Sequence, residues 1–265
     1  MKKLLVSLLI SISLIASPMA AVAASNPLVD TTKLEDGVVI LSYKADAKLK
    51  VIIEKNGEQV TYDLRNDGTA ESFPLQMGNG SYKISILENV VDKKYKYVTT
   101  KQVELDLDDE KEVYLASVQN VNWNNGMSTI AKAKELTKGL NTDKAKIKAV
   151  YEYVVNNITY DHNKISTLQS NYVPNIDNTI ASGKGICYDY ASVLAAMLRS
   201  QGIPVKLVKG YSKNVTGYHA WNEVFDSETG EWITMDTTYD AEMKAAGRTY
   251  SMIKDTAQFT KVFEY

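Results

Sequence analysis

A single thiol is the first candidate for chemistry, since Cys187 is the only cysteine among 265 residues. It lies in GKGICYDYASVLAAML (183–198), where apolar residues recur at helical spacing after two glycines. Cys187 is therefore expected in the first turn of a helix, where free backbone N–H groups and the helix dipole favour a thiolate. A lone cysteine can also be an inert buried side chain. Its place at the helix start, after glycines that allow close approach, favours a nucleophile.

A nucleophilic thiol needs a base, and the chain has two histidines. His162 lies in the polar segment YDHNK (160–164), where we expect an exposed side chain without a catalytic role. His219 lies in YHAWNEVF (218–225), whose pattern predicts a strand. We therefore expect His219 to be the base.

A carboxylate is expected beside that imidazole. EWITMD (231–236) predicts a second strand that forms a hairpin with the first. With a connection of about four residues, Phe225 pairs with Gly230, and His219 then lies opposite Asp236. Asp236 would orient the ring and stabilise its charged form, as the third member of a triad does.

Three motifs in this order resemble the transglutaminase-like superfamily of papain-type cysteine enzymes, in particular its exported bacterial members. They are the helix start GKGICYDYA (183–191), the strand YHAWNEV (218–224) and the strand WITMDTTYD (232–240). The similarity extends over residues 145–240. It implies that Cys187 is the nucleophile, His219 the general base and acid, and Asp236 the orienting carboxylate. It further implies a thioester intermediate formed from a peptide or glutamine carboxamide.

The motifs leave open what resolves the thioester. Water would make the protein a peptidase or amidase, and a lysine amine would make it a crosslinking transglutaminase. Analogy with exported bacterial relatives favours hydrolysis. A cell-surface binding protein with a vestigial triad is a further alternative. A metal enzyme has little support, because one cysteine and two distant histidines do not make a ligand set, and we expect no cofactor.

Aromatic side chains near the motifs could support the site. Trp221 is expected on the same strand face as His219, where it could exclude water from the imidazole. Tyr188 and Tyr218 could line a groove for an extended peptide, although core packing explains such residues equally well. Asp189 and Glu223 carry charges beside the motifs and could form a supporting ion pair, but either could equally be an ordinary solvated carboxylate. The backbone N–H of Cys187 is one expected donor to an oxyanion.

Two regions are expected to carry these motifs. Short strands rich in Val, Ile, Tyr and Thr are predicted at 37–43, 48–55, 59–64, 81–88, 95–107 and 111–116. Helices are predicted at 128–140 and 142–157, followed by a loop over 162–182 and strands at 203–211, 218–225 and 231–236. The fold class is therefore a two-domain protein. A β-sandwich domain over 27–118 precedes an α+β, papain-like catalytic domain over 122–265.

The first 24 residues predict export. Lys2 and Lys3 precede an apolar run that ends in the small residues 21–24, which is the pattern of a cleavable signal peptide. Its removal leaves 28 basic and 32 acidic residues, a net charge of −4. No basic block suggests a nucleic-acid partner. We expect a secreted or cell-surface monomer without a membrane span, acting on a protein or peptide substrate that could be associated with the cell wall.

Overall fold

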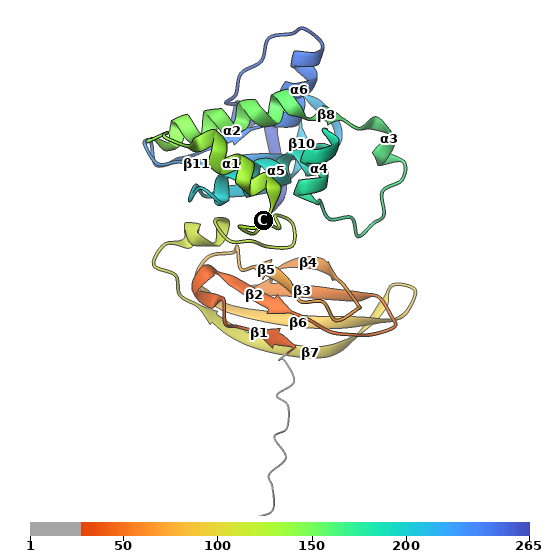
Figure 1. Cartoon of the computed structure of the whole chain (residues 1–265). Coiled ribbons are helices and arrows are strands. Elements are labelled where there is room, and N and C mark those ends of the chain that lie inside the picture. The colour runs from red at the N-terminus through yellow and green to blue at the C-terminus, as the bar shows by residue number, and fades with distance from the viewer. Residues whose placement is uncertain (1–27) are drawn as a thin grey trace, which may run out of the picture.

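The computed structural model describes residues 28–265, so the signal peptide predicted at 1–24 lies outside the described residues. A β-rich region comes first and a mixed α/β region follows (Figure 1). This order confirms the coarse prediction from the sequence. The division into two domains at 27–118 and 122–265 stays a prediction.

Two antiparallel sheets form the β-rich region. The larger has the strand order β4-β3-β6-β7, with β3 at Leu49–Lys55, β4 at Glu58–Leu64, β6 at Gly80–Val91 and β7 at Lys94–Leu105. The smaller has the order β1-β2-β5, with β1 at Val29–Asp30, β2 at Val38–Leu41 and β5 at Glu71–Pro74. The sheets share one apolar core, in which the rings of Tyr62 and Phe73 lie 5.0 Å apart.

Five of the six strands predicted in this region are confirmed, and the sixth is wrong. Residues 111–116 were expected to be extended, but the 3-10 helix η2 occupies Glu110–Tyr114. The side chain of Asp109 accepts a hydrogen bond from the backbone N–H of Lys111 and so caps this helix. A local cap therefore outweighs the strand preference of Val113 and Tyr114. The short strand β5 was not predicted.

A four-stranded antiparallel sheet and a set of helices form the α/β region. The strand order is β12-β11-β10-β13, with β10 at Val205–Ser212, β11 at Val215–Asp226, β12 at Glu231–Met235 and β13 at Phe259–Glu264. The longer helices are α1 at Ser128–Thr137, α2 at Asp143–Asn157, α5 at Cys187–Arg199 and α6 at Thr237–Ala245. Helix α5 is almost entirely buried between the sheet and the other helices. It is the central element of this region.

The segment expected to be a loop over 162–182 contains more structure than predicted. Helix α3 covers His162–Ile165, and α4 covers Ile176–Ser182. The two-residue strands β8 (Thr159–Tyr160) and β9 (Lys184–Gly185) pair in parallel. This pairing ties the end of α2 to the residues just before α5.

The predicted hairpin register is wrong by one position on each strand. Phe225 pairs with Trp232 rather than Gly230, because the four-residue connection runs from 227 to 230 instead of from 226 to 229. The observed pairing continues to Asn222 and Met235. Asp236 follows directly, at the start of α6. Each residue of β11 thus pairs two positions further along β12 than predicted. Asp236 and His219 stay close, since side chains two apart on a strand share a face.

The two regions pack against each other through buried polar contacts. The Arg199 guanidinium is 2% exposed and donates to the backbone oxygens of Ala116 at 2.7 Å and Tyr265 at 2.8 Å. The Tyr265 ring lies 5.7 Å from the Tyr62 ring of β4. The chain end accordingly lies at the junction of the regions (Figure 1). Apolar residues of both regions form one continuous core.

Across residues 28–265, no helix has the length and apolar character needed to cross a lipid bilayer.

Candidate active site

The imidazole of His219 and the carboxylate of Asp236 form a buried pair. His219 Nε2 lies 2.8 Å from Asp236 Oδ2, and the two side chains are 3% and 1% exposed. Asp236 is the N-cap residue of α6, where its Oδ1 accepts from the backbone N–H of Tyr239 at 3.0 Å. Capping therefore fixes the carboxylate, because one oxygen binds the helix and the other faces the ring.

Cys187 lies on the other side of the same imidazole. Burial alone would lower the pKa of His219, but hydrogen bonds with Asp236 and Cys187 raise that pKa to about 10. Because Nε2 binds Asp236, Nδ1 is the ring nitrogen left to interact with the thiol. The three side chains named from the sequence thus form one connected row, thiol to imidazole to carboxylate.

Cys187 is the first residue of α5 and is partly exposed, while the rest of the helix is buried. Gly183 ends α4 with a φ of +62°, a conformation that favours glycine. At Gly185, an added Cβ would lie 2.7 Å from Cβ of Asp189. The second glycine thus permits close contact between the chain before the thiol and the first turn of α5.

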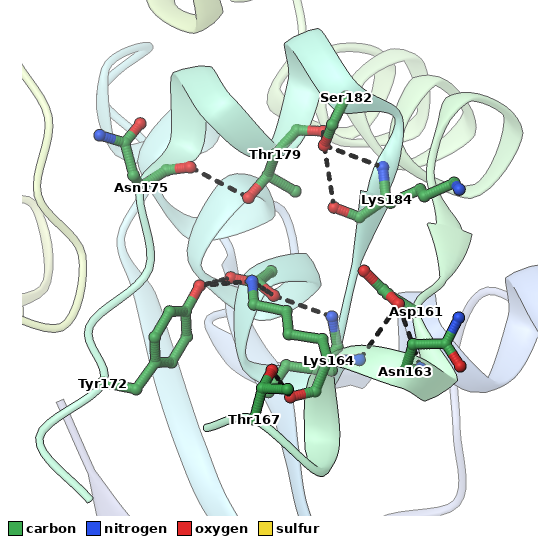
Figure 2. Close-up of polar contacts among 11 residues, drawn as sticks. Asp161, Asn163, Lys164, Thr167, Tyr172, Asn175, Thr179, Ser182 and Lys184 are labelled. Carbon is green, nitrogen blue, oxygen red and sulfur yellow. Dashed lines mark hydrogen bonds and ion pairs between the residues drawn. The ribbon is translucent and has the colours of Figure 1, made fainter. Parts of the chain in front are cut away.

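Asp189 fixes the start of α5. Its carboxylate is 0% exposed and accepts hydrogen bonds from the backbone N–H of Ile186 at 2.8 Å, from Lys164 Nζ at 2.6 Å and from the Tyr172 hydroxyl. Figure 2 shows Lys164 of α3 and Tyr172 of the segment between α3 and α4 reaching toward each other. This Asp189 cluster (Asp189, Lys164, Tyr172) attaches that segment to the residues beside the thiol.

The family comparison matches this part of the chain. Residues 130–237 match the model described as the transglutaminase-like superfamily, and this range contains Cys187, His219 and Asp236. This segment is therefore similar to the transglutaminase-like superfamily. The resemblance inferred from the motifs is confirmed.

Curated proteins and solved structures are similar to parts of this chain. The uncharacterized protein YebA of Bacillus subtilis is 33% identical over 111 residues, which cover 35% of this chain and 15% of YebA. A candidate cysteine protease of Cytophaga hutchinsonii is 15% identical with a TM-score of 0.47, covering 86% of this chain and 75% of that protein. LapG of Legionella pneumophila is 16% identical with a TM-score of 0.36, covering 52% and 82%. The chain spans less than one third of the length of the curated relatives it matches.

Aromatic residues surround the transglutaminase-like site in different ways. Trp221 is 1% exposed and stacks at 6.4 Å on the His219 ring, with Phe259 at 5.0 Å behind it. Tyr188 is buried, and its hydroxyl accepts from Asn120 Nδ2 at 2.7 Å. Tyr218 is 51% exposed. Trp221 therefore covers the imidazole, while Tyr218 faces solvent.

Other charged and aromatic residues beside the motifs make contacts outside the triad. His162 is 76% exposed and lies 3.8 Å from Glu242. Asp189 and Glu223 do not pair with each other, because Glu223 binds Lys261 at 2.7 Å. Trp232 packs against Tyr114 and Phe225. None of these contacts involves the triad.

A polar cleft of about 630 Å³ lies between the β-rich region and the segment before α4, lined by residues that include Arg65, Glu71, Gln119 and Asn171. No member of the row from Cys187 to Asp236 lines this cleft. It is therefore a separate feature of the surface.

Sequence reasoning missed Lys209 and Tyr160. Both lie close enough to Cys187 that its negative charge raises their pKa. At Lys209 this effect opposes burial, which lowers the pKa, and at Tyr160 it adds to burial, which raises the pKa. Burial raises the pKa of Tyr160 to about 12, with Cys187 contributing to the increase. Neither position belongs to the three motifs, so nothing local in the sequence marks it.

Proposed function

We propose that this protein is a cysteine-dependent acyl-transfer enzyme that acts on peptide or glutamine carboxamide bonds, with Cys187, His219 and Asp236 as its catalytic residues. The observation that carries the proposal is the buried His219–Asp236 pair at 2.8 Å, with the Cys187 thiol close enough to the same ring to raise its pKa. A raised pKa of His219 favours an imidazolium beside a thiolate, the charge state that a nucleophilic cysteine requires.

Acylation begins when the Cys187 sulfur attacks the substrate carbonyl carbon. The C=O π electrons move to oxygen, and the backbone N–H of Cys187 at the start of α5 supports the oxyanion. His219 then gives its proton to the leaving nitrogen, the C–N bond breaks, and an amine or ammonia departs. Asp236 keeps the ring oriented throughout, since α6 holds its other oxygen.

Deacylation needs a second nucleophile. Neutral His219 takes a proton from water, and the hydroxide attacks the thioester carbonyl. The C–S bond then breaks, which releases a carboxylic acid and regenerates the Cys187 thiolate beside protonated His219. An amine in place of water would give a crosslinked product. Transfer to an amine requires that the amine be bound and that water, at about 55 M, be excluded. Tyr211 and Tyr218 are 54% and 51% exposed and therefore do not exclude water, so we favour hydrolysis.

The experiment is intact mass spectrometry of a glutamine-containing peptide after incubation with the protein and a millimolar lysine analogue. A mass gain of deamidation or a cut peptide supports hydrolysis, and an adduct with the amine supports the crosslinking alternative. Cys187→Ala should abolish every product, and His219→Ala should reduce turnover at least about 10³-fold. His162→Ala is the matched control and should retain full activity, because this histidine is 76% exposed.

Product formation by Cys187→Ala at the wild-type level would refute the proposal, and no product from either protein would favour a binding protein with a vestigial triad. Equal losses from His162→Ala and His219→Ala would refute the choice of base.

The setting of the reaction is also a proposal. We propose that residues 1–24 direct export, that the mature protein is a secreted or cell-surface monomer, and that its substrate is a protein or peptide. Detection of a mature N-terminus near Ser25 in the culture medium would support export.

A further inference from the structure

Lys209 of β10 is a cation without an anion. Its Nζ lies 3.5 Å from the centre of the Tyr188 ring and 5.1 Å from that of Tyr265. Within residues 28–265, no hydrogen bond or ion pair engages this ammonium group. Lys209 is partly buried, and a charge partly removed from water is costly unless it is paired, a cost that two aromatic rings offset only in part.

The strand register defines the surface that Lys209 shares. Lys209 pairs with Ala220 and Tyr211 with Tyr218, so Lys209, Tyr211 and Tyr218 lie on one face of the sheet. Helix α5 covers the same face further along, where Asn222 Nδ2 donates to the backbone oxygen of Ala191. Beyond the first turn of α5 this face is open, since Tyr211 and Tyr218 are about half exposed.

Lys209 is therefore beside the thiol at the start of this open face. Tyr188, the ring that its ammonium contacts, directly follows Cys187 in α5. Burial lowers the pKa of Lys209 to about 8, and the negative charge of Cys187 acts in the opposite direction. At neutral pH the site thus holds a positive charge within electrostatic reach of the reacting sulfur.

We propose that Lys209 forms a carboxylate-binding subsite next to Cys187, so that the preferred acyl substrates carry an anionic group close to the scissile carbonyl. An arriving carboxylate would supply the missing counter-ion and offset the desolvation cost of the partly buried ammonium group. The exposed rings of Tyr211 and Tyr218 would contact the adjoining part of the substrate. This inference rests on the proposed function, because it assumes that Cys187 is the nucleophile.

The test compares two alkylating reagents that differ only in charge beside the reacting carbon. In both iodoacetate and iodoacetamide, the Cys187 sulfur forms a bond to carbon while the carbon–iodine bond breaks and iodide leaves. The quantity measured is the ratio of the two second-order rate constants, iodoacetate over iodoacetamide, at pH 7. The fraction of thiolate cancels in this ratio, because both reagents attack the same sulfur.

We expect Lys209→Met to lower this ratio about five- to tenfold, the effect of removing one charge at partly screened distance. Lys213→Met is the matched control, since Lys213 is an exposed lysine in the turn after β10, and its ratio should equal that of wild type. An unchanged ratio in Lys209→Met would overturn the inference. Equal slowing of both reagents would also overturn it, since Lys209 would then stabilise the thiolate without recognising a carboxylate.

A pH series on the unmodified protein gives a second readout that needs no variant. The titratable groups around Lys209 are Cys187 and Tyr188 of α5, His219 and Tyr218 of β11, Tyr211 of its own strand, and Tyr265, which directly follows β13. Burial raises the pKa of Tyr188 and Tyr265 well above their usual value, and His219 has a pKa of about 10. A fall of the ratio between pH 7 and 9 therefore reports on Lys209, and a constant ratio over this range would overturn the inference.

The two proposals fail in different ways. If neither reagent modifies Cys187 in the native protein, the thiol is not a nucleophile, and the proposed function is refuted together with this inference. If both reagents modify Cys187 but their ratio ignores Lys209, only the carboxylate subsite is refuted.

Discussion

The charge of His219 should depend on Asp236 far more than on any other group. In Asp236→Asn, the side-chain oxygen can still cap α6, so the helix start is preserved while the negative charge is lost. The atom that faces His219 Nε2 then becomes an amide NH2 group, which can donate to a neutral ring nitrogen but cannot accept from a protonated one. The variant therefore removes both the negative charge and the acceptor that stabilise the imidazolium.

The size of the effect follows from the pKa of His219. Its rise from 6.5 to about 10 is about 3.5 units, or about 5 kcal/mol at about 1.4 kcal/mol per unit. An opposite charge at hydrogen-bond distance contributes about one to three of such units. In Asp236→Asn the pKa of His219 should therefore fall to between about 7 and 9.

Stability should change with pH in a defined direction. Because folding raises the pKa of His219, its protonation stabilises the wild type fully below pH 6.5, and this contribution is lost as pH rises toward 10. At pH 6.5 the variant should have a free energy of unfolding lower by about 1–4 kcal/mol, and the difference should shrink toward pH 10. Lys209 titrates in the same range, but it does so in both proteins and cancels in the difference.

The assay is nitrogen-15 NMR of the imidazole groups between pH 5 and 11, combined with urea unfolding at pH 6.5 and 10. The chain has only two histidines, and His162→Gln assigns their signals. The same pKa of His219 in wild type and Asp236→Asn would refute the reasoning, as would a stability difference that does not vary with pH.

Three further changes test how the site is supported. Lys164→Met should lower the free energy of unfolding in urea by about 2 kcal/mol and slow alkylation of Cys187, because it leaves the buried Asp189 carboxylate without its cation. The control Lys148→Met, at an exposed ion pair, should change stability by less than about 0.5 kcal/mol. Gly185→Ala should cost about 1–3 kcal/mol, since the new Cβ would lie 2.7 Å from Asp189; wild-type stability would show that the chain there can move. The sequence pattern favours independent folding of residues 119–265, but Arg199 and Tyr265 would lose buried partners in the β-rich region. We therefore expect this fragment to lose most of its helical circular dichroism. A folded fragment with unchanged thiol reactivity would contradict this.

The sequence predicts the elements of this fold better than their exact pairing. Strand periodicity and turn residues locate β3, β4 and β6 to within about three residues. Residues 111–116 mislead because a capping side chain at Asp109 stabilises a 3-10 turn that strand propensity does not register. The predicted β11–β12 register differs from the observed one because the sequence predicts the length of the connecting loop but not where the loop begins. That starting point depends on the contacts of the turn.

The triad could be predicted and its surroundings could not. Cys187, His219 and Asp236 stand at motif positions whose spacing reflects one helix start and one hairpin. Lys209 and Lys164 reach the site from β10 and α3, and only tertiary packing brings them there. Residues that adjust charge and orientation have no local sequence pattern, because their role depends on distance in space.

The connection between the two regions contributes to the same site through Asn120. This residue lies in the connection between the regions, donates to the Tyr188 hydroxyl, and accepts from the Ser192 hydroxyl through its backbone oxygen at 3.0 Å. Both partners belong to α5, so the connection holds the helix whose first residue is Cys187. The hydrogen bond to the hydroxyl fixes the ring on which the Lys209 ammonium rests. The position of this charge near the thiol thus depends on how the two regions meet, which links their junction to the electrostatics of the reaction.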